Sequence, residues 1–152
     1  MTQQNHTREN QTLVLALLRS QQLFMRAMGS VFRSAGLTAS QWDTLETLSN
    51  KGALSINDLM RLTLSTSGNL DVVVKNLMQA GLVEKTVDER DRRARVLRLT
   101  QAGNQKVADF MPVHNRALEQ IFGDLGLQSK RETIRTLNQL RKKLPQPKKD
   151  AT

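Results

Sequence analysis

The pattern of apolar and polar positions predicts a chain built mainly from helices, beginning with a long one. Between Thr12 and Ala35 apolar residues recur at helical spacing without a proline, and Gly36 can end this helix in a left-handed conformation. Two neighbouring stripes make up its apolar face, one with Leu17, Phe24, Met28 and Val31 and the other with Val14, Leu18, Met25 and Phe32. One adjacent helix cannot cover a face this wide, so a second copy of the chain is expected to bury part of it.

Two shorter helices are predicted next from the residues that cap their first turns. Thr38 and Gln41 fit a capping box for a helix that ends before Gly52. Ser55 then opens a short helix that runs to about Leu62. This short helix is the first member of a predicted helix-turn-helix pair.

A fourth helix completes the pair, and its exposed residues are the first candidates for DNA contact. Its inward face, with apolar residues at i, i+3, i+4 and i+7, is Leu70, Val73, Val74 and Leu77, and Gly81 ends it. The second helix of such a pair lies in the major groove with its first turn against the bases. The candidate contacts are Ser65, Thr66, Ser67, Asn69, Asp71 and Lys75.

These polar residues have different chemistry toward DNA. Asn69 could read adenine, Asp71 could accept from cytosine N4, and Lys75 could bind phosphate or guanine. A purely structural interpretation stays open: Ser65 and Thr66 can serve only as caps. Asp71 can serve only to favour the helix N-terminus, since a carboxylate near phosphates is costly.

A short hairpin follows, with strands near residues 82–87 and 94–99. Leu97 and Leu99 point to one face and Arg98 to the other, as a half-buried strand requires. The loop and its edge hold the four arginines that fall between positions 90 and 95, which are Arg90, Arg92, Arg93 and Arg95. So many charges keep the loop in solvent, where guanidinium groups suit phosphates and the narrow minor groove. The alternative is a solvated hairpin whose aspartates and arginines pair only with one another.

Two more helices complete the predicted order. Thr100 caps a long helix that reaches about Phe122, and Ser129 opens the last one, which ends before Pro145. The fold class is therefore mainly α with a small antiparallel β-hairpin: a winged helix-turn-helix plus long dimerisation helices. We expect a flexible leader over 1–11, dimerisation helices over 12–36 and 101–144, a DNA-binding lobe over 37–100, and a flexible basic tail over 145–152.

Composition narrows the class of partner. The 152 residues include 23 Lys plus Arg against 14 Asp plus Glu, a net charge of +9, which favours nucleic acid or an anionic membrane surface. No apolar run of membrane-spanning length and no signal peptide occurs, so a soluble, cytoplasmic protein without a membrane partner is expected. With one Trp, four Phe and no Tyr, stacking on single-stranded bases is poorly supported.

Catalytic and metal chemistry find little support in the sequence. Cysteine is absent, and the only histidines, His6 and His114, have no nucleophile or second ligand at a useful spacing. We therefore expect neither an enzyme, nor a metal site, nor a cofactor. A small-molecule crevice lined by Met25, Met28 and Trp42 is conceivable, although core packing is the ordinary role of methionines at these positions.

Several of these segments together resemble the MarR family of transcriptional regulators. The resemblance rests on Ser65–Asn69, Val73–Leu77, the wing pattern Asp88-Glu-Arg-Asp91-Arg-Arg93, and Leu99-Thr-Gln-Ala-Gly103, and it extends from about residue 12 to 144. It implies a homodimer formed by the first, fifth and sixth helices on palindromic double-stranded DNA. It also implies a repressor that a small aromatic or lipophilic effector releases from DNA after binding near Trp42.

The resemblance also assigns roles within the wing. Arg93, and with it Arg92, corresponds to the arginines that enter the minor groove, and Asp91 to the acid that braces them. The chain departs from the family pattern at Asp71-Val72, where members often have Thr-Arg, and at Asn76, where they have a basic residue. These departures leave the operator sequence open. The competing function is a winged-helix module for protein–protein or anionic-surface contact without operator specificity.

Overall fold

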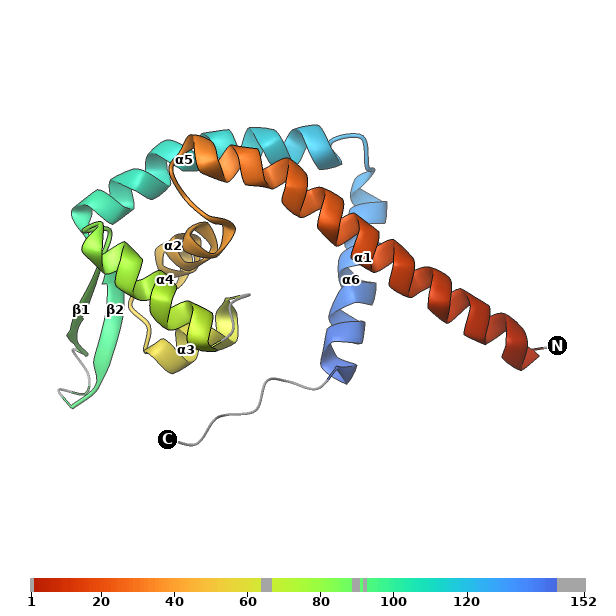
Figure 1. Ribbon diagram of the computed structural model, residues 1–152, viewed down its shortest axis with the longest axis horizontal. Coiled ribbons are helices and arrows are strands. Elements are labelled where there is room, and N and C mark those ends of the chain that lie inside the picture. The colour runs from red at the N-terminus through yellow and green to blue at the C-terminus, as the bar shows by residue number, and fades with distance from the viewer. Residues whose placement is uncertain (1, 64–66, 89–90, 92, 145–152) are drawn as a thin grey trace. The chain divides into compact units, whose positions relative to one another are not determined.

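The computed structural model describes residues 2–63, 67–88, 91 and 93–144, and in these ranges it has six helices and one hairpin (Figure 1). The order along the chain is four helices, two strands and two helices, which is the predicted order. The chain divides into two compact units, Met1–Ala117 and Leu118–Thr152. The fold is mainly helical with a small antiparallel hairpin, as the sequence predicted.

Helix α1, Thr2–Ser34, is longer than predicted because it begins at Thr2 and not near Thr12. No glycine or proline occurs before Gly29, so nothing in the polar leading segment breaks the helical backbone. Its C-terminal end agrees with the prediction. Gly36 has a φ of 67°, and the Leu37 N–H donates to the Phe32 carbonyl at 3.0 Å, which closes the last turn.

Helices α2, Ala39–Lys51, and α3, Ile56–Leu62, begin at the predicted caps. The Gln41 N–H donates to Thr38 Oγ1 at 3.2 Å, and the Thr38 N–H donates to Gln41 Oε1 at 2.8 Å, which confirms the capping box. The Asp58 N–H donates to Ser55 Oγ at 3.1 Å at the start of α3. Local capping therefore fixes where both helices start.

Helix α4, Ser67–Gln79, packs the predicted apolar face against the rest of the lobe. Its Leu70, Val73, Val74 and Leu77 are all buried. Leu45 of α2 and Leu59 of α3 are fully buried with them, so the three helices share one core. This core holds α4 in place while its opposite face stays exposed.

The hairpin consists of β1, Val83–Val87, and β2, Arg95–Leu99, close to the predicted strand bounds. The strands are antiparallel, with Val83 opposite Leu99 and Val87 opposite Arg95. Leu54, in the connection between α2 and α3, extends the sheet by a bridge to Leu97, with N–H to carbonyl distances of 3.0 and 2.8 Å. The middle of β2 is thereby tied to the connection between α2 and α3.

Helix α5, Gln101–Phe122, begins after Thr100 as predicted, whereas α6, Leu127–Lys143, begins before the predicted cap at Ser129. Gly126 occupies the N-cap of α6 without a side-chain hydrogen bond, and Ser129 lies inside the first turn. The prediction of a Ser129 cap was wrong because a Ser and a Glu three residues apart also fit inside a helix. Helix α6 has no buried residue.

An aromatic cluster joins α1, α2 and α5 within the first unit. Trp42 packs edge-on against Phe110, with ring centroids 4.8 Å apart, and lies 5.1 Å from His114. Phe32 of α1 contacts both Phe110 and His114, at centroid distances of 6.3 and 6.1 Å. The cluster therefore connects α2 to α1 and to the part of α5 that lies in the first unit.

Candidate nucleic-acid interface

Helix α3 is stabilised at its exposed side by a small polar network. Ser55 Oγ donates to Asp58 Oδ2 at 2.6 Å, and Arg61 forms an ion pair with the same carboxylate. The Ser55 hydroxyl, and after it the Arg61 guanidinium, hold the pKa of Asp58 below its ordinary 3.8 although partial burial acts in the opposite direction. Asp58 therefore stabilises the start of α3 in its charged form.

The exposed face of α4 is where the sequence placed DNA contacts. Asp71 and Lys75 are exposed as predicted, and Asn69 is exposed but donates a long hydrogen bond of 3.4 Å to Ser40 Oγ of α2. At about 100° per residue, Asn69 and Asp71 lie about 160° apart on the helix. They flank the exposed face from opposite sides, while Lys75 lies nearer its centre.

Val72 is a candidate contact that the sequence analysis missed. Its side chain is 55% exposed and lies at the centre of the outward face, between the two flanks. A signal was present, because Val72 falls outside the periodic set of Leu70, Val73, Val74 and Leu77. An exposed apolar group on a recognition helix suits contact with a thymine methyl.

The start of α4 is only partly visible in the described residues. Ser65 and Thr66 lie outside them, so their predicted capping and DNA contacts stay predictions. Ser67 is the first residue of α4, and its backbone alone is described. The contacts predicted for the first turn thus rest on the sequence alone, whereas the exposure of the outward face of α4 is seen in the structure.

The wing has a tip closed by backbone hydrogen bonds. The Asp88 N–H donates to the Ala94 carbonyl at 3.1 Å, and the Ala94 N–H donates to the Asp91 carbonyl at 2.9 Å. Asp91 Oδ1 also accepts from the Arg93 N–H at 2.9 Å. The carboxylate of Asp91 thus holds the backbone of the residue whose guanidinium is expected in the minor groove.

Two of the four wing arginines are described, and both are exposed. Arg93 lies at the tip and Arg95 at the first position of β2, opposite Val87. Arg98 differs from them, since its Nε donates to Glu84 Oε1 across the strands at 2.7 Å. Arg90 and Arg92 lie outside the described residues. Arg98 lies on the exposed face of the hairpin, as the sequence predicted.

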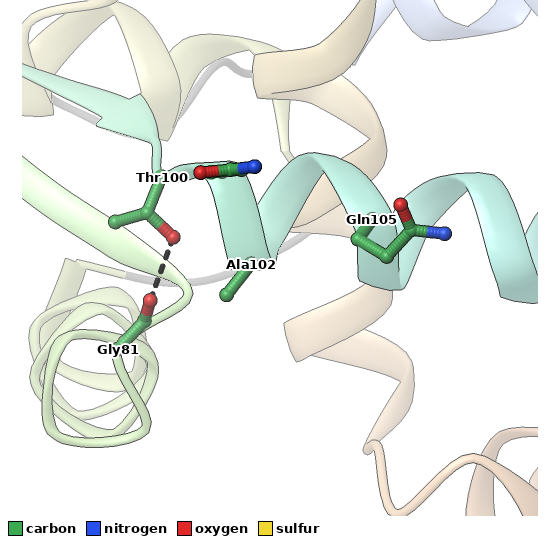
Figure 2. Close-up of a pocket in the computed structure, with 5 residues that line it drawn as sticks. Gly81, Thr100, Ala102 and Gln105 are labelled. Atoms are coloured by element: carbon green, nitrogen blue, oxygen red, sulfur yellow. Dashed lines mark hydrogen bonds between the residues drawn. The ribbon is translucent and has the colours of Figure 1, made fainter.

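The junction between α4, the wing and α5 explains the Leu99-Thr100-x-x-Gly103 pattern. Thr100 Oγ1 donates to the Gly81 carbonyl at 2.6 Å (Figure 2). The same oxygen accepts from the Gly103 N–H at 3.0 Å. A Cβ on Gly103 would lie 2.0 Å from the Leu82 carbonyl oxygen, so only glycine fits there. Thr100 and Gly103 therefore hold the start of α5 against the residues that follow α4.

An open pocket of about 500 Å³ lies at this junction, lined by Gly81, Thr100, Gln101, Ala102 and Gln105 (Figure 2). None of the predicted ligand residues lines it. Met28 and Trp42 are buried in the core, whereas Met25 is 39% exposed. The predicted crevice at these three residues stays a prediction.

Two buried polar atoms in the aromatic cluster have no hydrogen-bond partner among the described residues: Trp42 Nε1 and His114 Nδ1. Buried polar groups are normally paired, so these two atoms, like Thr63 Oγ1 elsewhere, are exceptions. Elsewhere in the described ranges, no three His, Asp or Glu side chains gather as a metal site would require. No helix in those ranges is long and apolar enough to cross a membrane.

Comparison with known proteins shows that this chain is similar to transcriptional regulators of one family. A family model described as the MarR family matches residues 35–94. The chain is 24% identical over 125 residues to the HTH-type transcriptional regulator FarR of Neisseria gonorrhoeae, which covers 80% of this chain and 83% of that protein. It is 30% identical over 106 residues to the transcriptional activatory protein BadR of Rhodopseudomonas palustris, covering 67% of this chain and 61% of that protein.

A solved structure shows the same fold. BpsR of Bordetella bronchiseptica, whose DNA binding is regulated by 6-hydroxynicotinic acid, resembles this chain with a TM-score of 0.75 at 23% identity. The likeness covers 86% of this chain and 98% of that one. It extends beyond the winged lobe, since so large a share of both chains is aligned.

Proposed function

The chain belongs to the MarR family of DNA-binding transcriptional regulators, and from that premise we propose that it is a homodimeric repressor of a palindromic operator. Members of this family regulate transcription and are not enzymes. The observation that carries the proposal is the pairing of an exposed recognition face on α4 with a wing whose Arg93 is held at the tip by Asp91. These two elements fit a major groove and the adjacent minor groove.

The homodimer is supported by apolar side chains that one chain leaves uncovered. Val14 and Leu18 on α1 are 53% and 59% exposed, and Ile134 and Leu137 on α6 are 58% and 43% exposed. Long helices with exposed apolar faces are typical of subunits that associate. A two-fold dimer would present two recognition helices to two half-sites, which is why a palindrome is expected. A protein that binds chromosomal DNA would act in the cytoplasm.

A small aromatic effector is proposed to weaken DNA binding. BpsR, a structural relative, responds to an aromatic acid. In this chain Trp42 Nε1 and His114 Nδ1 are both buried and have no hydrogen-bond partner among the described residues. A hydroxyl group could accept from the indole N–H and donate to an unprotonated imidazole nitrogen. Such a ligand must prefer the form that does not bind DNA.

Operator binding can be tested directly by fluorescence anisotropy on the DNA upstream of the gene itself. We expect nanomolar-range affinity for an inverted repeat, far weaker binding to a shuffled duplex, and a steep loss with salt. Sedimentation should give two chains per duplex. Equal affinity for both duplexes would instead support the winged-helix module without operator specificity.

The direction of regulation needs its own experiment, because the relative BadR is an activatory protein. We expect removal of this regulator to raise the output of a reporter placed behind its operator. A phenolic compound that raises the melting temperature should also lower operator affinity. A fall in reporter output on removal would make the chain an activator.

A further inference from the structure

The face of α1 that points away from the core carries all four basic residues of this helix. Arg8, Arg19, Arg26 and Arg33 fall within about 40° of one another at about 100° per residue. They lie roughly opposite Met28, which is fully buried. The row is about 37 Å long at 1.5 Å per residue. We call these four residues the arginine stripe.

The arginine stripe has no internal counter-charge in the described residues. The ion pairs Asp58–Arg61 and Glu84–Arg98 lie elsewhere. The only acidic residue in α1 is Glu9, which lies about 100° around the helix from Arg8. All four arginines are exposed. Their guanidinium groups are thus available to carboxylates or phosphates of another molecule.

Apolar side chains in and beside the arginine stripe favour a protein with carboxylates over a phosphate backbone as the partner. Leu15 lies within the angular range of the arginines and Leu23 about 60° to one side of its centre, and they are 50% and 63% exposed. Leu23, between Arg19 and Arg26, is the most exposed large apolar residue in the described part of the chain. A phosphate backbone offers nothing to bury such a leucine. A protein surface with both carboxylates and apolar groups does.

The spacing of the stripe indicates the shape of that partner. Arg19, Arg26 and Arg33 are seven residues apart, which is two helical turns. A second helix alongside α1 repeats its side chains at the same interval, so one carboxylate per heptad would meet each arginine. The same face of another copy would bring arginine against arginine. We propose that the arginine stripe docks an acidic, amphipathic helix of a different protein.

The probe for this proposal is a labelled helical peptide of about three heptads with one glutamate and one leucine per heptad. Binding is measured by fluorescence anisotropy near physiological salt with the full-length protein. We expect the double variant R19E/R26E to bind it at least about tenfold more weakly. The matched control, R131E/R135E, changes the same charge on exposed positions of α6 and should bind the peptide as the parent does.

Four further readouts separate the alternatives. Leu23→Gln, which leaves every charge in place, should also weaken peptide binding and provides the test if R19E/R26E does not fold. Operator affinity and the sedimentation mass should be the same in R19E/R26E as in the R131E/R135E control.

The proposal is overturned if a peptide with glutamine for glutamate binds equally well, or if both double variants lose peptide binding alike. It is also overturned if R19E/R26E selectively loses operator affinity or dissociates into single chains, which would assign the stripe to DNA or to the subunit interface. Loss of peptide binding alone would leave the proposed operator recognition by the parent protein intact.

Discussion

The winged lobe buries a core of apolar side chains, whereas apolar side chains of α6, in the C-terminal unit, are exposed. In the lobe, Leu45 and Leu59 are 0% exposed, and caps define where its helices begin. In the C-terminal unit, Ile134 and Leu137 are more than two-fifths exposed, and α6 begins at a glycine without a side-chain cap. The lobe can thus be stable within one chain, whereas α6 has an apolar face that needs a partner.

The largest effect is expected from a cavity in the lobe core. Leu59→Ala removes a fully buried side chain and should lower the free energy of unfolding by about 2–5 kcal/mol. Leu137→Ala, at a half-exposed position of α6, should mainly weaken association of the subunits. Thermal unfolding at several protein concentrations distinguishes the two, since only the second change should alter the concentration dependence. If the melting temperatures of both variants depended on protein concentration in the same way, the proposed difference between the lobe and α6 would be contradicted.

The junction at the start of α5 gives the next largest effect. Gly103→Ala would push a methyl group into the Leu82 carbonyl and should destabilise the protein by about 1–3 kcal/mol. Gly126→Ala is the control, because a Cβ there meets nothing within 4 Å and its φ is −57°. Urea denaturation measures both. A neutral Gly103→Ala would show that α5 can move away from the end of α4 without cost.

A smaller effect separates the wing tip from the rest of the lobe. Asp91→Ala removes the acceptor for the Arg93 N–H, so the tip should lose order while the folded core is kept. We expect operator affinity to fall by roughly 1 kcal/mol with the melting temperature nearly unchanged. Anisotropy and calorimetry on the same sample test this. A large drop in melting temperature would mean that Asp91 serves the fold more than the wing.

The smallest effect concerns acid stability at α3. Because the folded-state pKa of Asp58 is below 3.8, its contribution is present above that pH and is lost as pH falls through the lower folded value. Asp58→Asn should therefore be less stable than the parent protein above pH 3.8. The difference in stability between the two should shrink as the pH falls below that value. Unfolding midpoints between about pH 3 and 6 test the sign. A difference that grows on acidification would contradict it.

Much of the lobe could be predicted because its signals are local. The Thr38–Gln41 box, the inward face of α4 and the strand bounds follow from residues a few positions apart. The wing arginines were recognised for the same reason, as a charge cluster between two short strands.

What could not be predicted depends on packing between distant segments. The Asn69–Ser40 hydrogen bond and the 2.0 Å approach at Gly103 join residues from different elements. The early start of α1 has another origin, since a polar segment without Gly or Pro is compatible with both helix and loop. Helix α6 was misjudged at its start because Ser129 matched a capping pattern that the backbone does not use there.

The central claim, that the wing binds operator DNA through its exposed tip, is tested most directly by one pair of arginine variants. Arg93→Ala should cost about 1–3 kcal/mol of operator affinity per wing and flatten the salt dependence by about one counterion for each wing. Arg98→Ala, which removes an equal charge already paired with Glu84, should change both quantities far less. Anisotropy titrations of the two variants over a salt series give the result. Equal losses for Arg93→Ala and Arg98→Ala, or none for either, would contradict the assignment of the wing to DNA.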